Sequence, residues 1–318
     1  MTSSSCSTIS TRTRAPAIIA AAAALFVCAM PSAASAQQSY KTADEAVSAL
    51  VTAAKANDVK AVLTVLGPQG EDIVSSGDPV ADEGVRKEFV AAYDEKHEIH
   101  ADGGYAILII GKDDFPFPIP LVRKDDAWRF DTEAGRTEVL YRRIGANELN
   151  TIQACLAYVD AQNEYADKDR GDGVGVYAQR IISQPGKKDG LYWPTAAGEE
   201  ESPLGDLVAD AATEGYKPRG GGERTPFHGY YYKILTRQGP AAPGGVLDYV
   251  VKGKMIGGFA LVAWPAEYGN SGVMTFIVNH NGTIYEKDLG ERTAQVAAAM
   301  SAYNPDNSWK KTEMSEGQ

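Results

Sequence analysis

The sequence predicts an α+β protein in which a long helix is followed by an antiparallel sheet. Three observations support this fold class. Apolar residues recur at helical spacing in the first part of the chain, a long amphipathic helix is expected near the middle, and short strands with turn signals fill the last third. Helices and strands that come in separate runs, instead of alternating regularly, are typical of α+β folds.

The first 36 residues have the pattern of a cleavable signal peptide. Arg12 and Arg14 precede an apolar run over 17–30, and small residues lead up to Ala36, as signal peptidase requires. The apolar run is too short to span a bilayer as a helix, and no later stretch is apolar for long enough. We therefore expect cleavage between Ala36 and Gln37 and a periplasmic or secreted protein without a membrane span.

The charge and the cysteines restrict the partners and the chemistry. The chain carries a formal net charge of −11 at pH 7, and signal cleavage makes it more negative by removing two arginines and no carboxylate. Nucleic acid and anionic membrane surfaces are therefore not expected partners. Cys155 is the only cysteine after residue 36, so no internal disulfide is expected. No basic residue lies within five positions to activate its thiol, and we expect a buried hydrophobic side chain.

Residues 37–140 are predicted to form a first domain, with helices followed by a small antiparallel sheet. A capping box, Thr42-Ala-Asp-Glu45, begins one helix, Asp58 begins a second, and a third begins near Asp82. Short β-rich runs follow and end in the strand Trp128-Arg-Phe130. This order of elements resembles the nuclear-transport-factor-like superfamily, in which helices fill a curved sheet.

Residues 141–318 are predicted to form a second domain. Its first element is a helix over about 146–167, with an apolar stripe at helical spacing. The stripe consists of Leu149, Ile152, Leu156 and Val159. A Gly- and Pro-rich stretch over 183–227 follows and contains one short helix with Ser202 as its cap and Gly215 past its end. The remaining strands, the last two joined at Asn281-Gly282, are expected to form an antiparallel meander against the long helix.

An aspartate- and glycine-rich stretch, Asp167 to Asp172, is a candidate metal site. An EF-hand loop needs oxygen ligands at positions one, three and five, Gly at six and Glu at twelve, and neither register of this stretch supplies them. A helix end followed by a Gly-Asp-Gly turn explains the same residues, since Gly and Asp are ordinary turn formers. Calcium held by Asp167, Asp169 and Asp172 outside an EF-hand geometry stays as the alternative, and no other cofactor is expected.

No complete catalytic group of residues is found. His97 and His100, at an expected helix end, lack a third metal ligand. Gly269-Asn-Ser-Gly272 lacks both the spacing and the strand-to-helix context of a nucleophile elbow. No phosphate-binding loop or dinucleotide fingerprint occurs.

Aromatic residues provide the candidate ligand site. They lie in glycine-rich loops and at strand ends of the second domain, where exposed rings stack on sugars or peptides. Packing in the core is the alternative for the same rings. The candidates are Tyr192, Trp193, Tyr230, Tyr232, Trp264 and Tyr268.

Five strings of the second domain are distinctive. They are IGANE, DGLYWP, GYYYKIL, GGFALVAWPAEYG and GVMTFIVNHNGTIYEKDLG. They resemble exported bacterial proteins of the family catalogued as domain of unknown function 2950, DUF2950, over almost the whole mature chain. This resemblance implies no activity, substrate or catalytic residue.

The order of helix, tyrosine-rich strand and Asn-Gly hairpin is also similar to the globular part of type IV pilins and pseudopilins. There a helix packs on an antiparallel sheet. The chain differs from pilins by its cleavable signal, so this likeness implies a fold and no filament.

These observations predict an exported protein of the cell envelope that binds a partner or assists assembly without catalysis. The expected partner is an envelope protein or a glycan. The alternative is an envelope hydrolase that uses carboxylates at 160–172 together with the aromatic loops.

Overall fold

The computed structural model describes residues 37–196, 198–217 and 225–312. The predicted signal peptide lies outside these ranges. The α+β class is confirmed, because the described chain combines helices with several mainly antiparallel sheets. The likenesses to nuclear transport factors and to pilins stay predictions.

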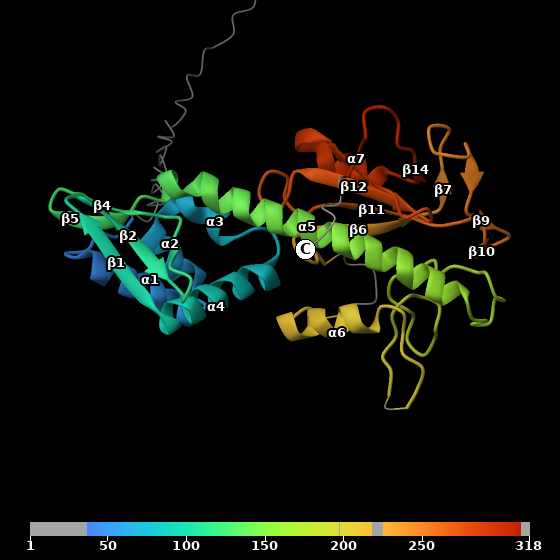
Figure 1. The fold of residues 1–318 in the computed structure, drawn as a ribbon, viewed down its shortest axis with the longest axis horizontal. Helices are drawn as coiled ribbons and strands as arrows, with labels where there is room; N and C mark the ends of the chain where they lie inside the picture. The colour runs from blue at the N-terminus through green and yellow to red at the C-terminus, as the bar shows by residue number, and fades with distance from the viewer. Residues whose placement is uncertain (1–36, 197, 218–224, 313–318) are drawn as a thin grey trace, which may run out of the picture. The chain divides into compact units, whose positions relative to one another are not determined.

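Helices form the beginning of the described chain (Figure 1). They are α1 (Ala43–Lys55), α2 (Val59–Leu66), the short 3-10 helix η1 (Pro68–Gly70), α3 (Glu71–Val74) and α4 (Pro79–Glu95). The predicted caps of the first two are present, since Thr42 Oγ1 accepts from Glu45 N and Asp58 Oδ1 accepts from Ala61 N. Helix α4 begins earlier than predicted. Asp78 caps it directly before a proline, which suits the first helical position.

The first sheet has the order β1-β2-β4-β5, with β3 paired to β2, and all its pairs are antiparallel. Its strands are β1 (His97–Asp102), β2 (Tyr105–Ile110), β3 (Phe115–Pro116), β4 (Leu121–Lys124) and β5 (Ala127–Phe130). Helices α1 and α2 contact β5. The expectation of a helix end at His97 and His100 was wrong, because both residues lie in the exposed strand β1.

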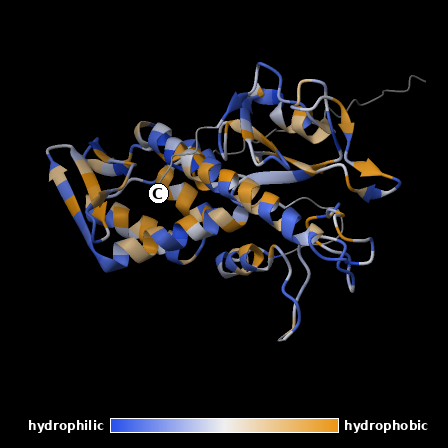
Figure 2. Cartoon of the chain, turned by 45° about the vertical axis from the view of Figure 1, so that its right-hand side comes forward, coloured by the Kyte–Doolittle hydropathy of each residue, from blue (hydrophilic) through white to orange (hydrophobic). Residues whose placement is uncertain are grey.

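A single long helix, α5 (Thr132–Ala166), connects this sheet with the rest of the chain. Its N-cap is Asp131, whose carboxylate accepts from Ala134 N, so the helix begins well before the predicted residue 146. Figure 2 shows hydrophilic and hydrophobic residues interspersed along it. Its buried side includes Val159 of the predicted stripe, and Ile152 and Leu156 pack half-buried against the same core. Leu149 is 63% exposed, whereas Cys155 and Tyr158 are buried.

The second sheet is antiparallel with the order β15-β13-β12-β11-β6, and α5 contacts β11 and β12. Its strands are β6 (Tyr230–Leu235), β11 (Ala260–Pro265), β12 (Met274–Asn279), β13 (Ile284–Asp288) and β15 (Lys310–Lys311). The smaller strands are β7 (Arg237–Gln238), β8 (Leu247–Asp248), β9 (Val250–Val251), β10 (Lys254–Met255) and β14 (Ala302–Tyr303). The remaining helices are α6 (Gly205–Glu214), η2 (Gly290–Arg292) and α7 (Thr293–Ala299).

Buried hydrophobic side chains form two clusters. One unites α1, α2 and the first sheet, and the other unites the second half of α5 with the second sheet. The described residues nevertheless fall in one compact unit by their contacts. The division into domains near residue 140 therefore stays a prediction. Within the described ranges, every helix is too short or too polar to cross a lipid bilayer.

Candidate functional site

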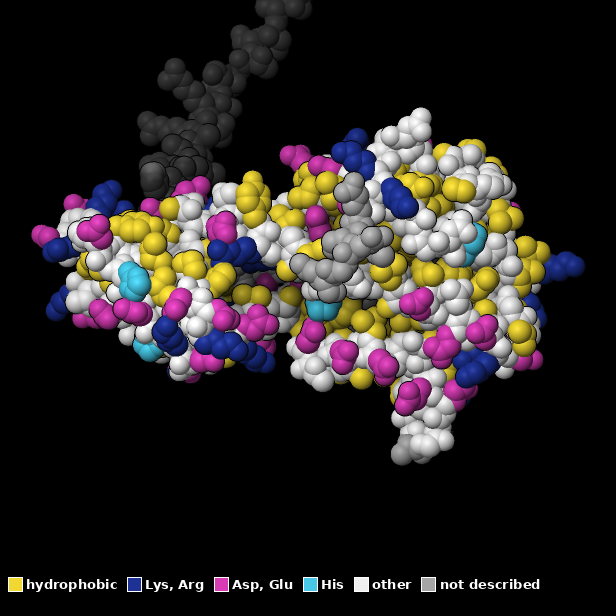
Figure 3. All heavy atoms as spheres, in the orientation of Figure 1, with side chains coloured by type: hydrophobic (Ala, Val, Ile, Leu, Met, Phe, Trp, Pro, Cys, Tyr) yellow, Lys and Arg dark blue, Asp and Glu magenta, His cyan; other side chains and the backbone are white. Residues whose placement is uncertain are grey.

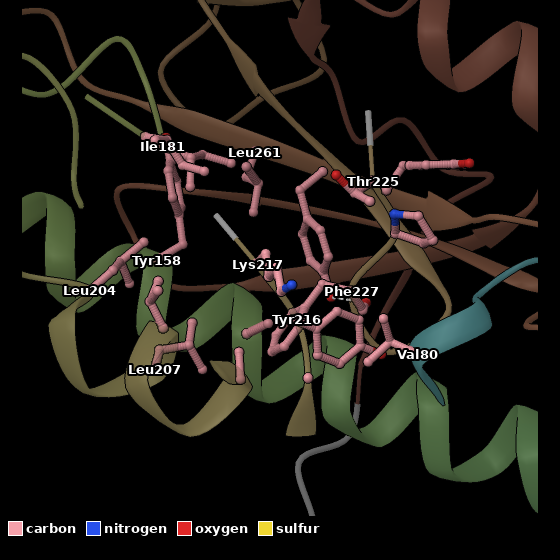
Figure 4. Close-up of a pocket in the computed structure, with 18 residues that line it drawn as sticks. Val80, Tyr158, Ile181, Leu204, Leu207, Tyr216, Lys217, Thr225, Phe227 and Leu261 are labelled. Atoms are coloured by element: carbon pink, nitrogen blue, oxygen red, sulfur yellow. Dashed lines mark hydrogen bonds between the residues drawn. The ribbon is translucent and has the colours of Figure 1, made fainter. Parts of the chain in front are cut away.

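A cavity of about 470 Å³ lies between α5, α6 and the second sheet (Figure 4). Helix α5 contributes Ala154 and Tyr158, and α6 contributes Leu207, Val208 and Ala211. Strands β6 and β11 contribute Tyr231, Tyr232 and Leu261. The rest of the lining comes from Val80, Ile181, Ile182, Leu204, Gly215, Tyr216, Lys217, Thr225, Pro226 and Phe227. The lining is therefore mainly aliphatic and aromatic.

Helix α6 forms one wall of the cavity because it is amphipathic. Leu207, Val208 and Ala211 recur at helical spacing and line the cavity, whereas Asp206 and Asp210 are exposed. The helix ends as the sequence predicts, with Gly215 in the left-handed conformation. It begins later than predicted. Gly205 is its first residue, and no side chain caps it.

Tyrosine hydroxyls of the lining already have hydrogen-bond partners. Tyr158 donates to Ala260 O at 3.3 Å and accepts from Gln162 Nε2 at 3.0 Å. Tyr216 donates to Asp78 Oδ2 at 2.8 Å, and Tyr232 donates to Thr151 Oγ1 at 3.4 Å. Burial raises the pKa of all three phenols. These rings therefore stay neutral and present mainly apolar surface to the cavity.

Asp78 connects this lining to the N-terminal helices. It is 1% exposed, and its Oδ2 also accepts from Gly229 N at 2.9 Å. Its Oδ1 caps α4 by accepting from Val80 N and Ala81 N. A buried carboxylate is costly unless it is hydrogen-bonded, and here four donors satisfy it. Asp78 thus fixes Tyr216 and Val80, two lining residues, relative to each other.

Cys155 lies beside the cavity's lining on α5 and is completely buried. Burial raises the pKa of its thiol to about 12. A thiol is nucleophilic as the thiolate, which is scarce at neutral pH when the pKa is this high. Cys155 therefore behaves as a small hydrophobic residue, in agreement with its sequence context.

Among the predicted ligand-binding rings, Tyr232 alone lines the cavity. Trp193, Tyr230 and Trp264 are buried in the second hydrophobic cluster, and Tyr192 packs against that cluster half-buried. Tyr268 lies at a turn, where its hydroxyl donates to Asp288 Oδ2 at 3.2 Å. The structure thus does not bring the six rings together. The ligand-binding role remains a prediction for Tyr232.

Sequence reasoning missed most of the residues that line the cavity. Tyr231 and Phe227 were absent from the candidates, and so was the inner side of α6. The amphipathic spacing of Leu207, Val208 and Ala211 was a usable signal, since it indicates a helix that covers an apolar surface. Nothing in the sequence places that surface next to α5.

Two of the three aspartates of the candidate metal loop have protein partners. Asp169 Oδ1 accepts from Gly171 N at 2.8 Å and from Gly173 N at 2.9 Å, and these hydrogen bonds lower the pKa of its carboxyl. Asp172 lies 3.5 Å from Lys254 Nζ. In the described part of the chain, no three His, Cys, Asp or Glu side chains are grouped as metal ligands. Calcium binding by Asp167, Asp169 and Asp172 remains a prediction.

Comparison with protein families gives one match. The family model described as "Protein of unknown function (DUF2950)" matches residues 37–312. The comparison with curated proteins and the comparison with solved structures each found no match.

Proposed function

Because the chain belongs to the DUF2950 family, whose description assigns no function, we propose a function from its own cavity. The protein is a non-catalytic binding protein that holds an apolar ligand between α5, α6 and the second sheet. The cavity itself carries this proposal. Its volume of about 470 Å³ falls in the range of roughly 300–1,000 Å³ that is typical of small-molecule sites.

The chemistry of the lining supports an apolar ligand better than the predicted glycan. Sugar binding needs polar groups that are free to bond the ligand's hydroxyls, but Tyr158, Tyr216 and Tyr232 already have partners. The aliphatic side chains of α6 favour hydrocarbon instead. Each methylene group that such a surface removes from water contributes about 0.8 kcal/mol to binding.

Export through the predicted signal peptide is consistent with this role. An apolar molecule in an aqueous compartment such as the periplasm needs a protein that shields it from water. The alternative role as a hydrolase has less support, because Asp160, Asp167, Asp169 and Asp172 do not line the cavity.

Binding of a neutral, environment-sensitive dye tests the proposal. N-phenyl-1-naphthylamine should gain fluorescence with the wild-type protein, and unlabelled hydrocarbons should displace it. Ala211→Phe, which places a ring in the cavity, should abolish the gain. Ala212→Phe is the matched control, because Ala212 is exposed on the same helix. Circular dichroism verifies that both variants fold. Equal dye binding by folded Ala211→Phe and wild-type protein would exclude this cavity as the site.

A further inference from the structure

We propose that the ligand is an anionic single-chain amphiphile whose hydrocarbon chain occupies the cavity and whose anionic group meets Lys217. This inference rests on the function proposed above and specifies the class of its ligand. Lys217 is the only charged side chain among the described residues that line the cavity. One cation among the described lining residues, in a lining that is mainly apolar, matches a molecule with one anionic end.

The position of Lys217 suits a head group. Its side chain is exposed, whereas Ala211, another lining residue, is buried. In the view of Figure 4, Lys217 lies between Leu207 of α6 and Leu261 of β11. An ammonium group that both lines the cavity and reaches water allows a charged head to stay partly hydrated. The chain of the ligand would then extend along the apolar side chains.

Among the described residues, the acidic group closest to Lys217 in the sequence and the acidic group bonded to Tyr216 both have other partners. Glu214, three residues earlier, has its carboxylate 3.6 Å from His228 Nε2. Asp78 accepts from Tyr216 and Gly229, as described above. Within the described ranges, no hydrogen bond or ion pair of the Lys217 ammonium group is found. It is thus available to an anionic ligand.

Lys217 is a positively charged residue in an acidic protein. The protein is acidic overall, with a net charge of −11, and the outer side of α6 carries Asp206, Asp210 and Glu214. Figure 3 shows acidic side chains below a hydrophobic area in the region of α6. General electrostatic attraction would therefore favour cations at this surface. Among the described lining residues, Lys217 is the group that can give a preference for an anionic ligand, so one substitution tests the inference.

Displacement of N-phenyl-1-naphthylamine by matched twelve-carbon amphiphiles tests the inference. The competitors are dodecanoate, dodecyl phosphate, dodecanol and dodecylamine, each below its micelle concentration. We expect dodecanoate to displace the dye at a concentration roughly fivefold lower than dodecanol. A solvent-exposed ion pair contributes up to about 1 kcal/mol to the binding free energy, which corresponds to this ratio. Lys217→Met should remove the preference, so that dodecanoate and dodecanol displace the dye at similar concentrations. Lys60→Met, an exposed lysine on α2, is the control and should retain it.

The outcomes separate this inference from the proposed function. If wild-type protein binds neither the dye nor any amphiphile, the proposed function fails and this inference with it. If dodecanol or dodecylamine competes as well as dodecanoate, and Lys217→Met changes nothing, the anionic class is wrong but the cavity still binds apolar molecules. If dodecyl phosphate is preferred to dodecanoate, the head group of the ligand is a phosphate, and the reverse order indicates a carboxylate.

Discussion

At the scale of single residues, buried polar side chains determine how the lining of the cavity is held. Asp78 is the clearest case, since one carboxylate caps α4 and accepts from Tyr216 and Gly229. Asp58 offers a comparison, because it caps α2 through Ala61 N and is exposed. Both aspartates cap a helix, but Asp78 also accepts two hydrogen bonds from residues far away in the sequence.

Replacement of the two aspartates by alanine should separate these roles. Asp58→Ala should lower the free energy of unfolding by about 1 kcal/mol, the usual effect of a lost N-cap. Asp78→Ala should lower it by about 3 kcal/mol or more, because Tyr216 and Gly229 lose their acceptor in a buried place. Urea unfolding measures both values. Equal losses would mean that the bonds to Tyr216 and Gly229 contribute nothing.

A half-buried histidine should make stability depend on pH. His280 lies against the rings of Tyr249 and Phe259, and burial lowers its pKa. The unfolded chain takes up a proton near the ordinary value of about 6.5, before the folded His280 does. The free energy of unfolding should therefore fall as the pH decreases below that value, until the folded side chain is protonated as well.

Unfolding in urea between neutral and mildly acidic pH measures this effect. His280→Leu should reduce the loss of stability on acidification, since the variant has no proton to take up at this position. His100→Gln in strand β1, where the side chain is exposed, serves as the comparison variant for the loss of a histidine. An unchanged slope in His280→Leu would assign the pH dependence to other groups.

At the scale of elements, α5 contains two glycines, one packed closely against another segment and one with open space beside it. A Cβ atom on Gly135 would lie 2.7 Å from Ile119 Cα and 2.7 Å from Pro118 O, whereas one on Gly145 would meet nothing within 4 Å. Gly145→Ala should raise the free energy of unfolding by about 0.5–1 kcal/mol, because alanine loses less entropy in a helix. Gly135→Ala should lower it by at least about 1 kcal/mol through overpacking. Thermal melts compare the two, and a stabilising Gly135→Ala would contradict the close approach of α5 to residues 118–119.

The loop after α5 is expected to be held by its own hydrogen bonds. Asp169 accepts from Gly171 N and Gly173 N, and both glycines have positive φ angles that suit glycine best. Asp169→Ala should lower the melting temperature, and addition of calcium or of a chelator should leave the wild-type value unchanged. A rise in melting temperature with calcium that Asp169→Ala and Asp172→Ala both abolish would instead establish the predicted metal site.

Element types could be predicted from the sequence more completely than their ends. The antiparallel strands around Asn281-Gly282 and the caps at Thr42 and Asp58 are local signals, and the structure contains them. The beginning of α5 could not be found, because the segment 132–145 is rich in charged residues and has no sustained apolar stripe. Its stability comes instead from a cap, from a pair such as Glu138–Arg142, and from contacts with α3 and η1.

At the scale of the whole molecule, the cavity depends on residues that are far apart in the sequence. Val80, Tyr158 and Leu261 all line it, yet no spacing rule relates them. The aromatic candidates were chosen by density, which does not distinguish core packing from a ligand surface. Trp264 and Tyr230 were chosen by this criterion, but both are buried in the core. Sequence analysis therefore found the parts of the fold and one lining residue, Tyr232, but not the cavity.

Hydrogen bonds of one half-buried arginine connect the segment after α2 with the turn before β12. Arg143 of α5 donates to Asp72 O at 2.7 Å, and it also donates to Ile73 O and to Asn270 Oδ1. Asn270 in turn donates to Ser75 O at 2.9 Å. Burial lowers the pKa of Arg143, and its hydrogen-bond partners compensate for part of the lost hydration.

Replacement of Arg143 should split the unfolding of the protein into two separate transitions. We expect wild-type protein to unfold in one transition, since α5 and the bonds of Arg143 couple the clusters. Arg143→Leu should produce two transitions, because the carbonyl groups of Asp72 and Ile73 lose their donor while each cluster keeps its own core. Hydrogen exchange with mass spectrometry can follow α1 and β11 separately in increasing urea. Arg142→Leu is the matched control, since Arg142 lies next in the chain but pairs with Glu138 and the ring of Phe115. In Arg142→Leu, α1 and β11 should lose protection from hydrogen exchange at the same urea concentration, as in the wild type. If α1 and β11 also open together in Arg143→Leu, the predicted division near residue 140 does not correspond to two independently stable domains.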